Sequence, residues 1–553
     1  MPTLDPPARD TSGSKVRDGW ASLAARSIIP SLGNYCLLLV LVLLVGNSSR
    51  FLTDSDTGWH IRTGDWIVDH GRVPHRDVFS YTMAGHEWFA WEWLTDVAMS
   101  AIHRVRGLVG IVAASILLLA LSYGALFHVM RWRGADAITS FVLTLVAAYT
   151  SMIHWLARPH LVSMALMIVW CAIVETYRRT RTRWIYAVPV LIALWANFHG
   201  AFVVTFAMLG IYAAGDWLEL ASRGQGRSLA TSRAMSTYGV VGGLSAVGAL
   251  LTPYGFQLYG HLWEFLTDRA LLGGIQDFQS PNFHHADGMM IEWLVFLGVV
   301  AAVRAARHRR FVESGLVLFW SHLTLQSERH VALAVIVLVP FIAAELSQGV
   351  ASVVARAGSW HDPWGSRSVA VRSWYQGMMR VDGQLNGLAG YAGLLGFALI
   401  AAAGGLGDRW LQGQFDPRRF PVAAVDAMVA ENRSTMLGTH LFAHDQYGGY
   451  LIYRLYPDIK VFVDGRNDLF ARGKVLDDMV AVAGAEPSWA GVLDRYDVGL
   501  LLLPVGSPIG QIAQLSNQWK LEYQDRTAQV LSRTARKGRG KAWTDSKIAS
   551  GGG

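Results

Sequence analysis

The sequence predicts a polytopic α-helical membrane protein of about eleven transmembrane helices, followed by a small C-terminal α/β domain. Hydrophobic residues make up 52% of the 553 residues and charged residues only 16%, whereas a soluble domain carries about 25% charged residues. Apolar runs of the length that a membrane-crossing helix needs recur through the first three quarters of the chain. Beyond them the pattern changes to short apolar runs with helical stretches between them, which is typical of an α/β domain.

The apolar runs predict the positions of the transmembrane helices. A helix needs roughly 20 apolar residues to cross a bilayer, and several runs are shorter, so some ends are expected to be broken or to be lined by protein. The predicted spans are Ile28–Gly46, Leu108–Met130, Ala137–Ile153, Leu161–Tyr177, Trp184–Ala196, Ala201–Leu220, Tyr238–Leu251, Met290–Val303, Phe311–Leu325, Val331–Leu346 and Leu388–Leu406.

The charge of the connecting segments predicts their orientation. Arginines cluster in one set of segments, at 131–133, 178–183, 223–233, 304–310 and 356–380. The alternate segments are nearly free of lysine, at 47–107, 154–160, 197–200, 252–289 and 326–330. Since cytoplasmic loops carry the basic residues of membrane proteins, the first set and the N-terminus are expected in the cytoplasm. An odd number of spans then places the C-terminal domain in the periplasm of a bacterial inner-membrane protein.

The chain is therefore expected to have four parts. These are a cytoplasmic tail at 1–27, a transmembrane domain at 28–406 with a first periplasmic loop at 47–107, a periplasmic α/β domain at 407–533, and a disordered basic tail at 534–553. In the first loop, four aromatic residues precede the helix-like stretch Leu94–Val105, as in a helix lying along a membrane surface. In the periplasmic domain we expect a helix at Val422–Glu431 and strands at Lys460–Val463, Gly499–Leu503 and Ala528–Leu531.

The composition argues against two other kinds of protein. The net charge of +7 could indicate a nucleic-acid partner, but the basic residues lie in short clusters between apolar runs, so membrane orientation explains them. The two cysteines, Cys36 and Cys171, lie inside apolar runs, where each is expected to be a small buried side chain. We expect no nucleic-acid partner, disulfide or cysteine-based metal site.

Polar residues gather on the segments predicted to face outward. The first group follows the first span and contains Asp54, Asp56, His60 and Arg62. A carboxylate at this depth is partly desolvated, which raises its pKa and makes it a better general base. The alternative is a solvated turn in which an aspartate caps the helix that follows.

The second group surrounds Arg158, with His154 and His160 on either side. The planar guanidinium of an arginine suits a phosphate, and Pro159 can begin the next helix because its missing N–H costs nothing there. The alternative is that the group only anchors the chain at the membrane interface.

Two further groups interrupt apolar runs on the same side. Asn197 and His199 form a polar break between two spans, which needs partners and can face a cavity. Arg329 and His330 follow Glu328, and Arg329 either pairs with that glutamate or faces a lipid phosphate. Because all four groups lie on one side, we expect them to share one outward cavity.

Taken together, these motifs resemble the large group of bacterial membrane proteins with a GT-C-type glycosyltransferase fold. The stretches that carry the resemblance are 54–64, 73–82, 92–94, 157–160, 194–200, 252–255 and 328–330, then 447–452 and 461–466 near the C-terminus. The segment from Asp56 to Arg62 is similar to the Asp-x-x-x-x-x-Arg stretch of oligosaccharyltransferase catalytic subunits, in which the aspartate lies at the reacting centre. Protein O-mannosyltransferases are also distantly similar.

The resemblance implies an enzyme that takes a sugar from a polyprenyl phosphate or diphosphate on the outer face. It transfers the sugar to a hydroxyl or amide of a glycan, lipid or protein acceptor, usually with inversion. Two features depart from those relatives. The C-terminal region has no Trp-Trp-Asp motif, and the second outer loop offers His154, Arg158 and His160 in place of carboxylates. Both departures argue against peptide N-glycosylation and against a divalent metal, so no cofactor is expected.

The resulting hypothesis assigns roles to these residues. Asp56 is the expected general base, and Asp54 orients it or replaces it. Arg158, Arg329 and His330 are expected to bind the donor phosphate. The remaining wall of the pocket is formed by His60, Arg62, His154, His160, Asn197 and His199. Asp464 and Arg466 are expected to be exposed in the periplasmic domain, as acceptor contacts or as a structural ion pair. The competing classes are a polysaccharide polymerase or ligase, a transporter and a non-catalytic envelope assembly protein.

Overall fold

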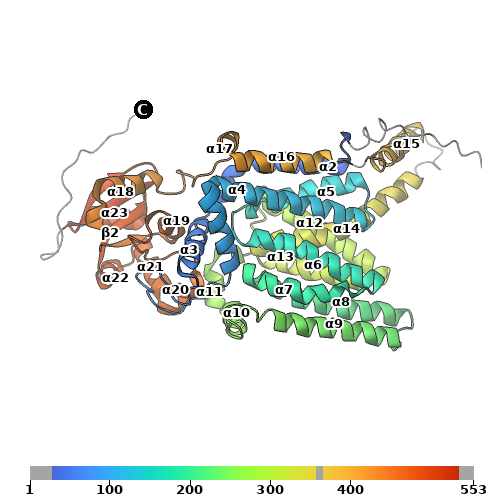
Figure 1. Ribbon diagram of the computed structural model, residues 1–553, viewed down its shortest axis with the longest axis horizontal. Coiled ribbons are helices and arrows are strands. Elements are labelled where there is room, and N and C mark those ends of the chain that lie inside the picture. The colour runs from blue at the N-terminus through green and yellow to red at the C-terminus, as the bar shows by residue number, and fades with distance from the viewer. Residues whose placement is uncertain (1–27, 357–364, 386, 437, 535–553) are drawn as a thin grey trace, which may run out of the picture.

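The computed structural model describes residues 28–356, 365–385, 387–436 and 438–534. The long helices run side by side in one bundle, and the C-terminal sheet with its helices lies against one end of that bundle (Figure 1). The expected N-terminal tail and almost all of the expected basic tail lie outside the described residues.

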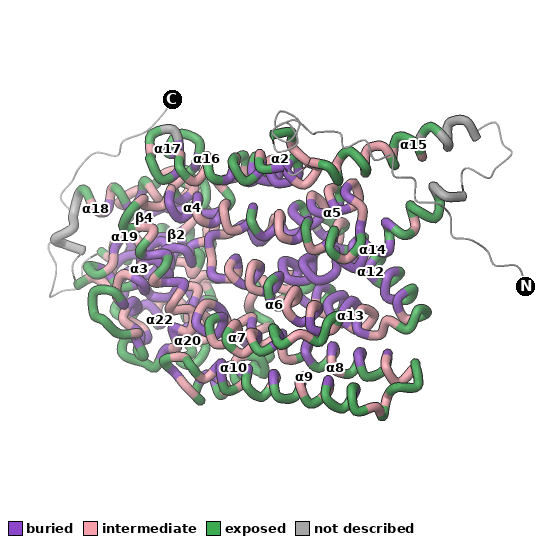
Figure 2. The backbone as a smooth tube through the Cα atoms, turned by 45° about the vertical axis from the view of Figure 1, so that its right-hand side comes forward, coloured by how far each residue is buried: buried purple, intermediate pink, exposed green. Residues whose placement is uncertain are grey.

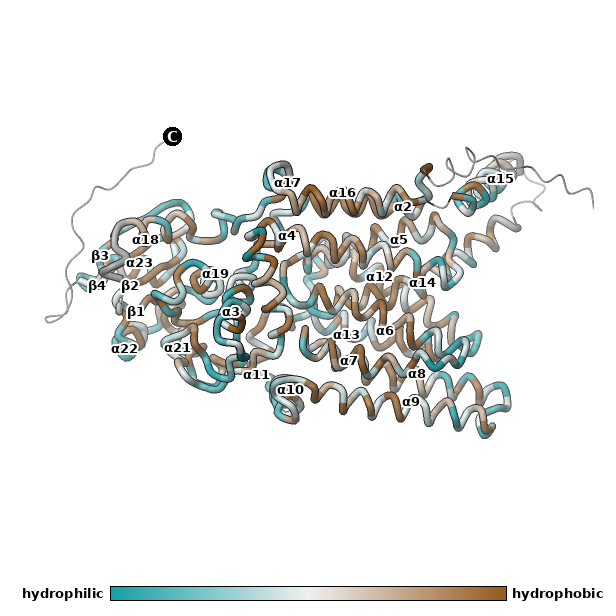
Figure 3. The backbone as a smooth tube through the Cα atoms, in the orientation of Figure 1, coloured by the Kyte–Doolittle hydropathy of each residue, from teal (hydrophilic) through white to brown (hydrophobic). Residues whose placement is uncertain are grey.

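Each predicted span overlaps one helix of the bundle. These helices are α2 (Leu32–Gly46), α4 (Trp93–Trp132), α5 (Ala137–Thr150), α6 (His160–Thr180), α7 (Ala187–Phe198), α8 (Val204–Ser222), α9 (Leu229–Gly248), α12 (Ala286–Arg307), α13 (Phe311–Gln326), α14 (Val331–Arg356) and α16 (Ala389–Ala403). Five helices in the described residues are long and apolar enough to cross a membrane, and four more are apolar but shorter. Hydrophobic residues follow these helices along most of their length (Figure 3). The chain is thus a helical membrane protein, while a count of eleven crossings stays a prediction.

The surface helix predicted at Leu94–Val105 is the first part of α4. Gly107 has a φ of 58° and a ψ of −155°, which breaks the helix at the point where the predicted transmembrane span begins. Glycine adopts this positive φ without the steric cost that a side chain would impose. The backbone therefore turns at Gly107 from the outer loop into the bundle.

The arginine clusters lie at the end of the bundle away from the C-terminal sheet, and many are paired with glutamates. Arg178 contacts Glu219 at 2.7 Å, and Arg310 contacts Glu313 at 2.9 Å. These pairs join α6 to α8 and close the loop that begins α13. The polar breaks of the alternate set of segments meet at the opposite end, so the predicted division of the loops into two sets is confirmed by the geometry.

Short helices cover the end of the bundle beside the sheet and surround the sheet itself. They are α3 (Asp56–His70), α10 (Gln257–Thr267), α11 (Arg269–Gly274), α17 (Leu406–Trp410), α18 (Val422–Met436), α19 (Asp445–Leu455), α20 (Asn467–Phe470), α21 (Val475–Ala483), α22 (Trp489–Arg495) and α23 (Pro508–Leu515). A further helix, α15 (Gly365–Asp382), lies at the other end of the bundle (Figure 1). The described 3₁₀ turns are η1 (Ser48–Leu52), η2 (Met152–His154), η3 (Arg183–Tyr186), η4 (Gly200–Val203), η5 (Gln276–Phe278), η6 (Glu328–His330) and η8 (Ala471–Gly473).

The C-terminal sheet has the order β1-β2-β4-β3, formed by β1 (His440–Ala443), β2 (Val498–Pro504), β3 (Trp519–Gln524) and β4 (Ala528–Arg533). β1 is parallel to β2, and the other pairs are antiparallel. Two of the three predicted strands and the predicted helix are confirmed as β2, β4 and α18. The third was wrong, because Val461 exchanges backbone hydrogen bonds with Phe79 and Tyr81 of the first outer loop instead of joining the sheet.

The first outer loop packs closely against the C-terminal part. A Cβ atom on Gly58 of α3 would lie 2.3 Å from the carbonyl oxygen of Gly449 in α19, so two glycines allow the two backbones to touch. Buried residues are continuous across this junction (Figure 2). The expectation that Asp464 and Arg466 are exposed was wrong. Both are buried, and Arg466 also pairs with Asp77 of the outer loop at 2.8 Å.

Candidate functional site

The site lies at the end of the bundle that faces the C-terminal part, where loops distant in sequence are joined by backbone hydrogen bonds. The N–H of Ala157 donates to the carbonyl of Phe51 at 2.9 Å, and the hydroxyl of Thr57 donates to the carbonyl of Ala157 at 3.0 Å. These two bonds hold the loop before α6 against the start of α3. These bonds place Arg158 next to Asp54 and Asp56 of the first outer loop.

Arg158 is the centre of a cluster of carboxylates. Its Nη1 lies 2.8 Å from Asp54 and its Nη2 lies 2.8 Å from Asp56, so one guanidinium bridges both aspartates. Asp277 of η5 approaches Nη1 at 3.7 Å. The predicted meeting of Asp56 and Arg158 is therefore observed. Asp277 was missed, because a single aspartate in a long loop carries no local signal of its own.

Asp56 is enclosed on both sides of its carboxylate. Oδ2 faces Arg158, and a Cβ atom on Gly465 would lie 2.0 Å from Oδ1, so the loop between Val463 and Arg466 touches that oxygen. Burial raises the pKa of Asp56 to about 7, against the lowering effect of the positive charge of Arg158. Gly465 thus brings the C-terminal part into the site, where a side chain would displace the carboxylate.

Glu92, immediately before α4, is a carboxylate of the site that the site prediction from sequence missed. It lies between two histidines, with Oε1 3.4 Å from Nε2 of His199 and Oε2 3.8 Å from Nε2 of His60. Nδ1 of His60 lies 2.6 Å from Asp96, and Nδ1 of His199 lies 2.8 Å from the hydroxyl of Ser163. Burial raises the pKa of Glu92 to about 7 and holds the pKa values of both histidines well below the usual range.

Arg329 is the second arginine of the site, in η6. Within the described part of the chain it pairs with no carboxylate, and its guanidinium lies over the ring of Phe278 at 4.8 Å. The hydroxyl of Ser327 donates to the carbonyl of Asp277 at 2.8 Å, which fixes η6 against η5. η5 also carries Asp277, which lies 3.7 Å from Arg158, so Arg329 lies in a turn beside the loop that contacts Arg158. The positive charges of Arg329 and Arg158 both lower the pKa of Glu92.

The global architecture can be compared with known proteins once this geometry is established. No protein-family model and no curated protein matches the sequence. Among solved structures, the chain is similar to the oligosaccharyltransferase AglB from Archaeoglobus fulgidus in complex with an inhibitory peptide and a dolichol-phosphate. The two are 11% identical with a TM-score of 0.55, and the alignment covers 85% of this chain and 69% of AglB. This chain has a GT-C-type fold.

Two further solved structures are similar to this GT-C-type protein. The oligosaccharyltransferase of Archaeoglobus fulgidus tethered to an acceptor peptide is 12% identical with a TM-score of 0.52, over 85% of this chain and 69% of that one. ArnT from Cupriavidus metallidurans in the apo state is 14% identical with a TM-score of 0.47, over 90% of this chain and 97% of that one. The sequence resemblance to GT-C-type proteins is thus confirmed at the level of the fold.

Some residues predicted to line the pocket of the GT-C-type fold hold its loops together instead. Arg62 donates from Nε to the carbonyl of Tyr453 in α19 at 2.9 Å, which ties α3 to the C-terminal part. Asn197 accepts from the indole N–H of Trp93 at 2.7 Å and donates to the carbonyl of Leu251 at 2.9 Å. The polar atoms of both side chains are engaged in these contacts.

Three of the predicted histidines behave in the same way. His154 donates to the carbonyl of Glu328 at 2.8 Å, and His160 donates to the carbonyl of His154 at 2.8 Å. His330 donates to the carbonyl of Leu323 at 3.1 Å, near the end of α13. These bonds order the loops that carry Arg158 and Arg329, while His60 and His199 turn toward Glu92.

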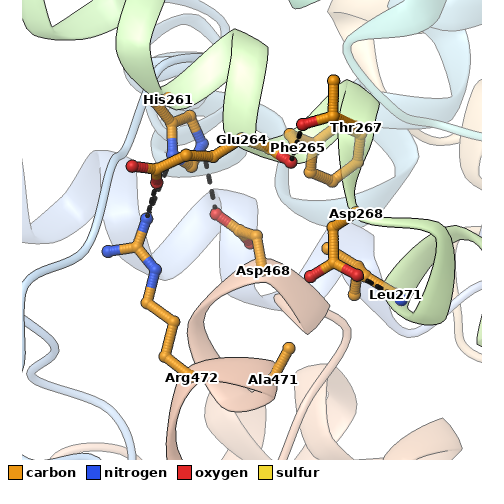
Figure 4. A pocket seen from close by; sticks show the side chains of 9 residues that line it. All are labelled: His261, Glu264, Phe265, Thr267, Asp268, Leu271, Asp468, Ala471 and Arg472. Atoms are coloured by element: carbon orange, nitrogen blue, oxygen red, sulfur yellow. Dashed lines mark hydrogen bonds and ion pairs between the residues drawn. The ribbon is translucent and has the colours of Figure 1, made fainter.

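A polar cavity of about 360 Å³ opens beside the site, between the α10–α11 segment and the C-terminal part. Figure 4 shows His261, Glu264, Phe265 and Asp268 reaching it from α10 and the start of α11, opposite Asp468 and Arg472. The ring of Phe265 lies 5.8 Å from that of Phe278, on which Arg329 rests. One aromatic wall therefore separates this cavity from the arginines.

The donor set argues against a divalent cation at the carboxylates. Among the described residues, no group of three histidine, cysteine or acidic side chains is arranged to hold a metal ion. The guanidinium of Arg158 already bridges the oxygens of Asp54 and Asp56, where such an ion would need them. The chemistry of the site is therefore derived without a metal.

Proposed function

We propose that the chain is a membrane glycosyltransferase that takes a sugar from a polyprenyl phosphate-type donor and passes it to an acceptor hydroxyl. The observation that carries the proposal is Arg329, an arginine without a described carboxylate partner, in a turn that is hydrogen-bonded to η5 beside the bridging Arg158. A half-buried cation of this kind favours an anionic ligand, because a desolvated charge without a partner is costly. The GT-C-type fold, shared with an oligosaccharyltransferase solved with a dolichol-phosphate, makes a lipid phosphate the fitting anion.

The two arginines stabilise the departing phosphate. As the bond between the sugar and the phosphate breaks, negative charge grows on the phosphate oxygen, and fixed cations at that position lower the barrier. Arg329 is free to turn its guanidinium toward the phosphate, whereas Arg158 is held by Asp54 and Asp56 and presents its charge from a fixed position. The sequence assigned His330 to the same phosphate, and its bond to Leu323 makes it a support for η6.

The acceptor has to lose a proton as it attacks the anomeric carbon, usually with inversion. Asp56, expected from the sequence, and Glu92 are the two enclosed carboxylates of the site whose pKa values are raised to about 7. A pKa near the working pH suits a general base. One of these two groups takes the proton in the proposed reaction.

The cavity of Figure 4 suits a carbohydrate acceptor. Its carboxylates, Glu264, Asp268 and Asp468, can accept hydrogen bonds from vicinal hydroxyls, and the ring of Phe265 offers a flat face for a sugar. The acidic lining disfavours a strongly anionic acceptor. By the positive-inside rule this end of the bundle faces the periplasm, and the arginine–glutamate end faces the cytoplasm of a bacterial inner-membrane protein.

Lipid binding tests the proposal. The purified full-length chain is titrated in detergent with undecaprenyl phosphate, undecaprenol and phosphatidylglycerol, with the unfolding temperature as readout. We expect saturable stabilisation by undecaprenyl phosphate alone. Arg329→Gln should weaken it by about 10- to 100-fold, the value of a hydrogen bond to a charged group. The matched control is Arg495→Gln, an arginine on the exposed face of the C-terminal part. Equal stabilisation by undecaprenol would reject the proposal.

A further inference from the structure

Resting on the proposed function, we propose that Glu92, rather than Asp56, takes the acceptor's proton, and that His60 and His199 position its carboxylate. The two carboxylates differ in how their oxygens are engaged.

Asp56 has no oxygen free for an incoming acceptor. Oδ2 is engaged by Arg158 at 2.8 Å, and Oδ1 is covered by the backbone of Gly465. Asp56 therefore holds Arg158 in place, and both of its oxygens are already engaged.

Glu92 is contacted by titratable side chains that are neutral. Within the described residues its close titratable neighbours are His60 and His199, and no arginine or lysine lies within ion-pair distance. The ring of Trp91, its neighbour in the sequence, lies 5.7 Å from that of Phe265 in the cavity. The segment that carries Glu92 thus borders the proposed acceptor cavity.

The contacts of His199 make it a hydrogen-bond donor to Glu92. Its Nδ1 accepts the backbone N–H of Ala201 at 3.3 Å, so that nitrogen carries no proton in the neutral ring. The hydroxyl of Ser163 lies 2.8 Å from the same nitrogen and can donate to it as well. The single proton of the neutral ring then sits on Nε2 and points to the carboxylate of Glu92 at 3.4 Å.

The contacts of His60 make it a second hydrogen-bond donor to Glu92. Its Nδ1 lies 2.6 Å from Oδ1 of Asp96, and burial raises the pKa of Asp96 well above its usual range, so the acid proton of Asp96 is donated to Nδ1. The proton of the neutral ring then sits on Nε2, a buried nitrogen without a hydrogen-bond partner among the described residues. Oε2 of Glu92 lies 3.8 Å from this nitrogen, and catalytic contacts of this length tighten when substrate binds.

The proposed step balances in atoms and charge. The acceptor oxygen forms a bond to the anomeric carbon as its O–H proton passes to Glu92. The bond between that carbon and the phosphate oxygen breaks, and its electron pair stays on the phosphate, which leaves beside Arg329 and Arg158. Protonated Glu92 then releases its proton to water before the next turnover.

The charges around Glu92 set the pH range of the step. Burial raises its pKa to about 7; Arg329 and Arg158 oppose this rise, and Asp56 and Asp468 add to it. His60 and His199 are neutral, since burial lowers their pKa values. A general base works when deprotonated, so turnover should rise with pH through about 7 and level off above it.

The experiment separates donor binding from proton transfer. Full-length wild type, Glu92→Gln, Glu92→Asp and Asp56→Asn are compared in undecaprenyl phosphate binding and in the release of free lipid phosphate. The donors are polyprenyl phosphates bearing mannose, glucose, galactose or arabinose. Glu92→Gln should bind undecaprenyl phosphate within about 2-fold of wild type and lose turnover by about 100-fold or more, the share of a general base. Glu92→Asp should recover part of the turnover, and Asp56→Asn should mainly weaken donor binding.

Two further readouts cover the histidines and folding. His60→Leu should raise the midpoint of the pH–turnover profile, because a hydrogen-bond donor to the charged form of Glu92 is lost, and a merely structural role would not move it. Since the charged form of Glu92 is disfavoured by burial, Glu92→Gln should be at least as stable as wild type at pH 8, with the difference shrinking toward pH 5.

The outcomes distinguish this inference from the proposed function. The assignment of Glu92 is overturned, while the proposed function stands, by either of two results. One is turnover by Glu92→Gln above one half of the wild-type value. The other is loss of turnover in Asp56→Asn with unchanged donor binding. If the wild type neither binds undecaprenyl phosphate nor releases it from any of the donors, the proposed function is rejected, and the role of Glu92 with it.

Discussion

Arg466 provides a direct test of how the outer loop and the C-terminal part are joined. Its Nε and Nη2 contact the two oxygens of Asp464 at 2.7 and 2.6 Å, and its Nη1 contacts Asp77 at 2.8 Å. The guanidinium also lies 4.5 Å from the ring of Trp88. In Arg466→Met the volume of the side chain is similar, but two buried carboxylates lose their cation, which destabilises the junction by about 3–5 kcal/mol. At 1.4 kcal/mol for each factor of ten, the fraction of molecules in which the outer loop and the C-terminal part have separated should rise by about 100-fold or more.

Limited proteolysis of the purified protein in detergent measures this population, because cleavage follows the open fraction when opening is fast. The matched control is Arg495→Met, whose side chain is 59% exposed and pairs with Asp478 at 3.0 Å. A surface pair of this kind is worth about 0–1 kcal/mol, so cleavage should change by less than about 5-fold. Equal cleavage of both variants at pH 8 would refute the reasoning.

Three further results are expected from the site itself. Gly465→Ala should reduce turnover by more than about 10-fold, because its methyl group would lie 2.0 Å from Oδ1 of Asp56. The control is Gly491→Ala, which has open space around its Cβ position and should leave turnover unchanged when the two purified variants are assayed side by side. Arg158→Lys should weaken undecaprenyl phosphate binding by about 10-fold, because an ammonium cannot bridge Asp54 and Asp56 as a guanidinium does; equal affinity in a thermal-shift titration would contradict this. Burial raises the pKa of Asp56 to about 7, above its value in the unfolded chain, so the folded protein loses stability as Asp56 ionises between about pH 4 and pH 7. The unfolding temperature of the wild type should therefore fall over that range, and Asp56→Asn should flatten this fall. A parallel fall in both proteins would argue against this reasoning.

The helices of the bundle follow from local sequence alone. An apolar run of sufficient length satisfies its backbone hydrogen bonds within itself as a helix, whatever lies around it. Local sequence also marks the turn in α4, because Gly107 lies between a polar and an apolar helical stretch. The division of loops into an arginine-rich set and a polar set likewise depends only on composition.

The strands were harder to predict, because a strand needs a partner from elsewhere in the chain. β1 has only four residues, and its hydrogen bonds come from β2, more than fifty residues later. Val461 has the pattern of a strand, yet its partners are Phe79 and Tyr81 of the first outer loop. Local sequence cannot choose between such partners.

For the site, the sequence by itself determined which residue types lie at the polar end of the bundle, including Asp56, Arg158 and Arg329. Only the tertiary structure decided which of them meet. It brings Arg158 to two aspartates about one hundred residues away, leaves Arg329 without a described carboxylate, and encloses Glu92 between two histidines. The physical reason is that charge, burial and free lone pairs depend on distances between segments, whereas a sequence pattern records only separation along the chain.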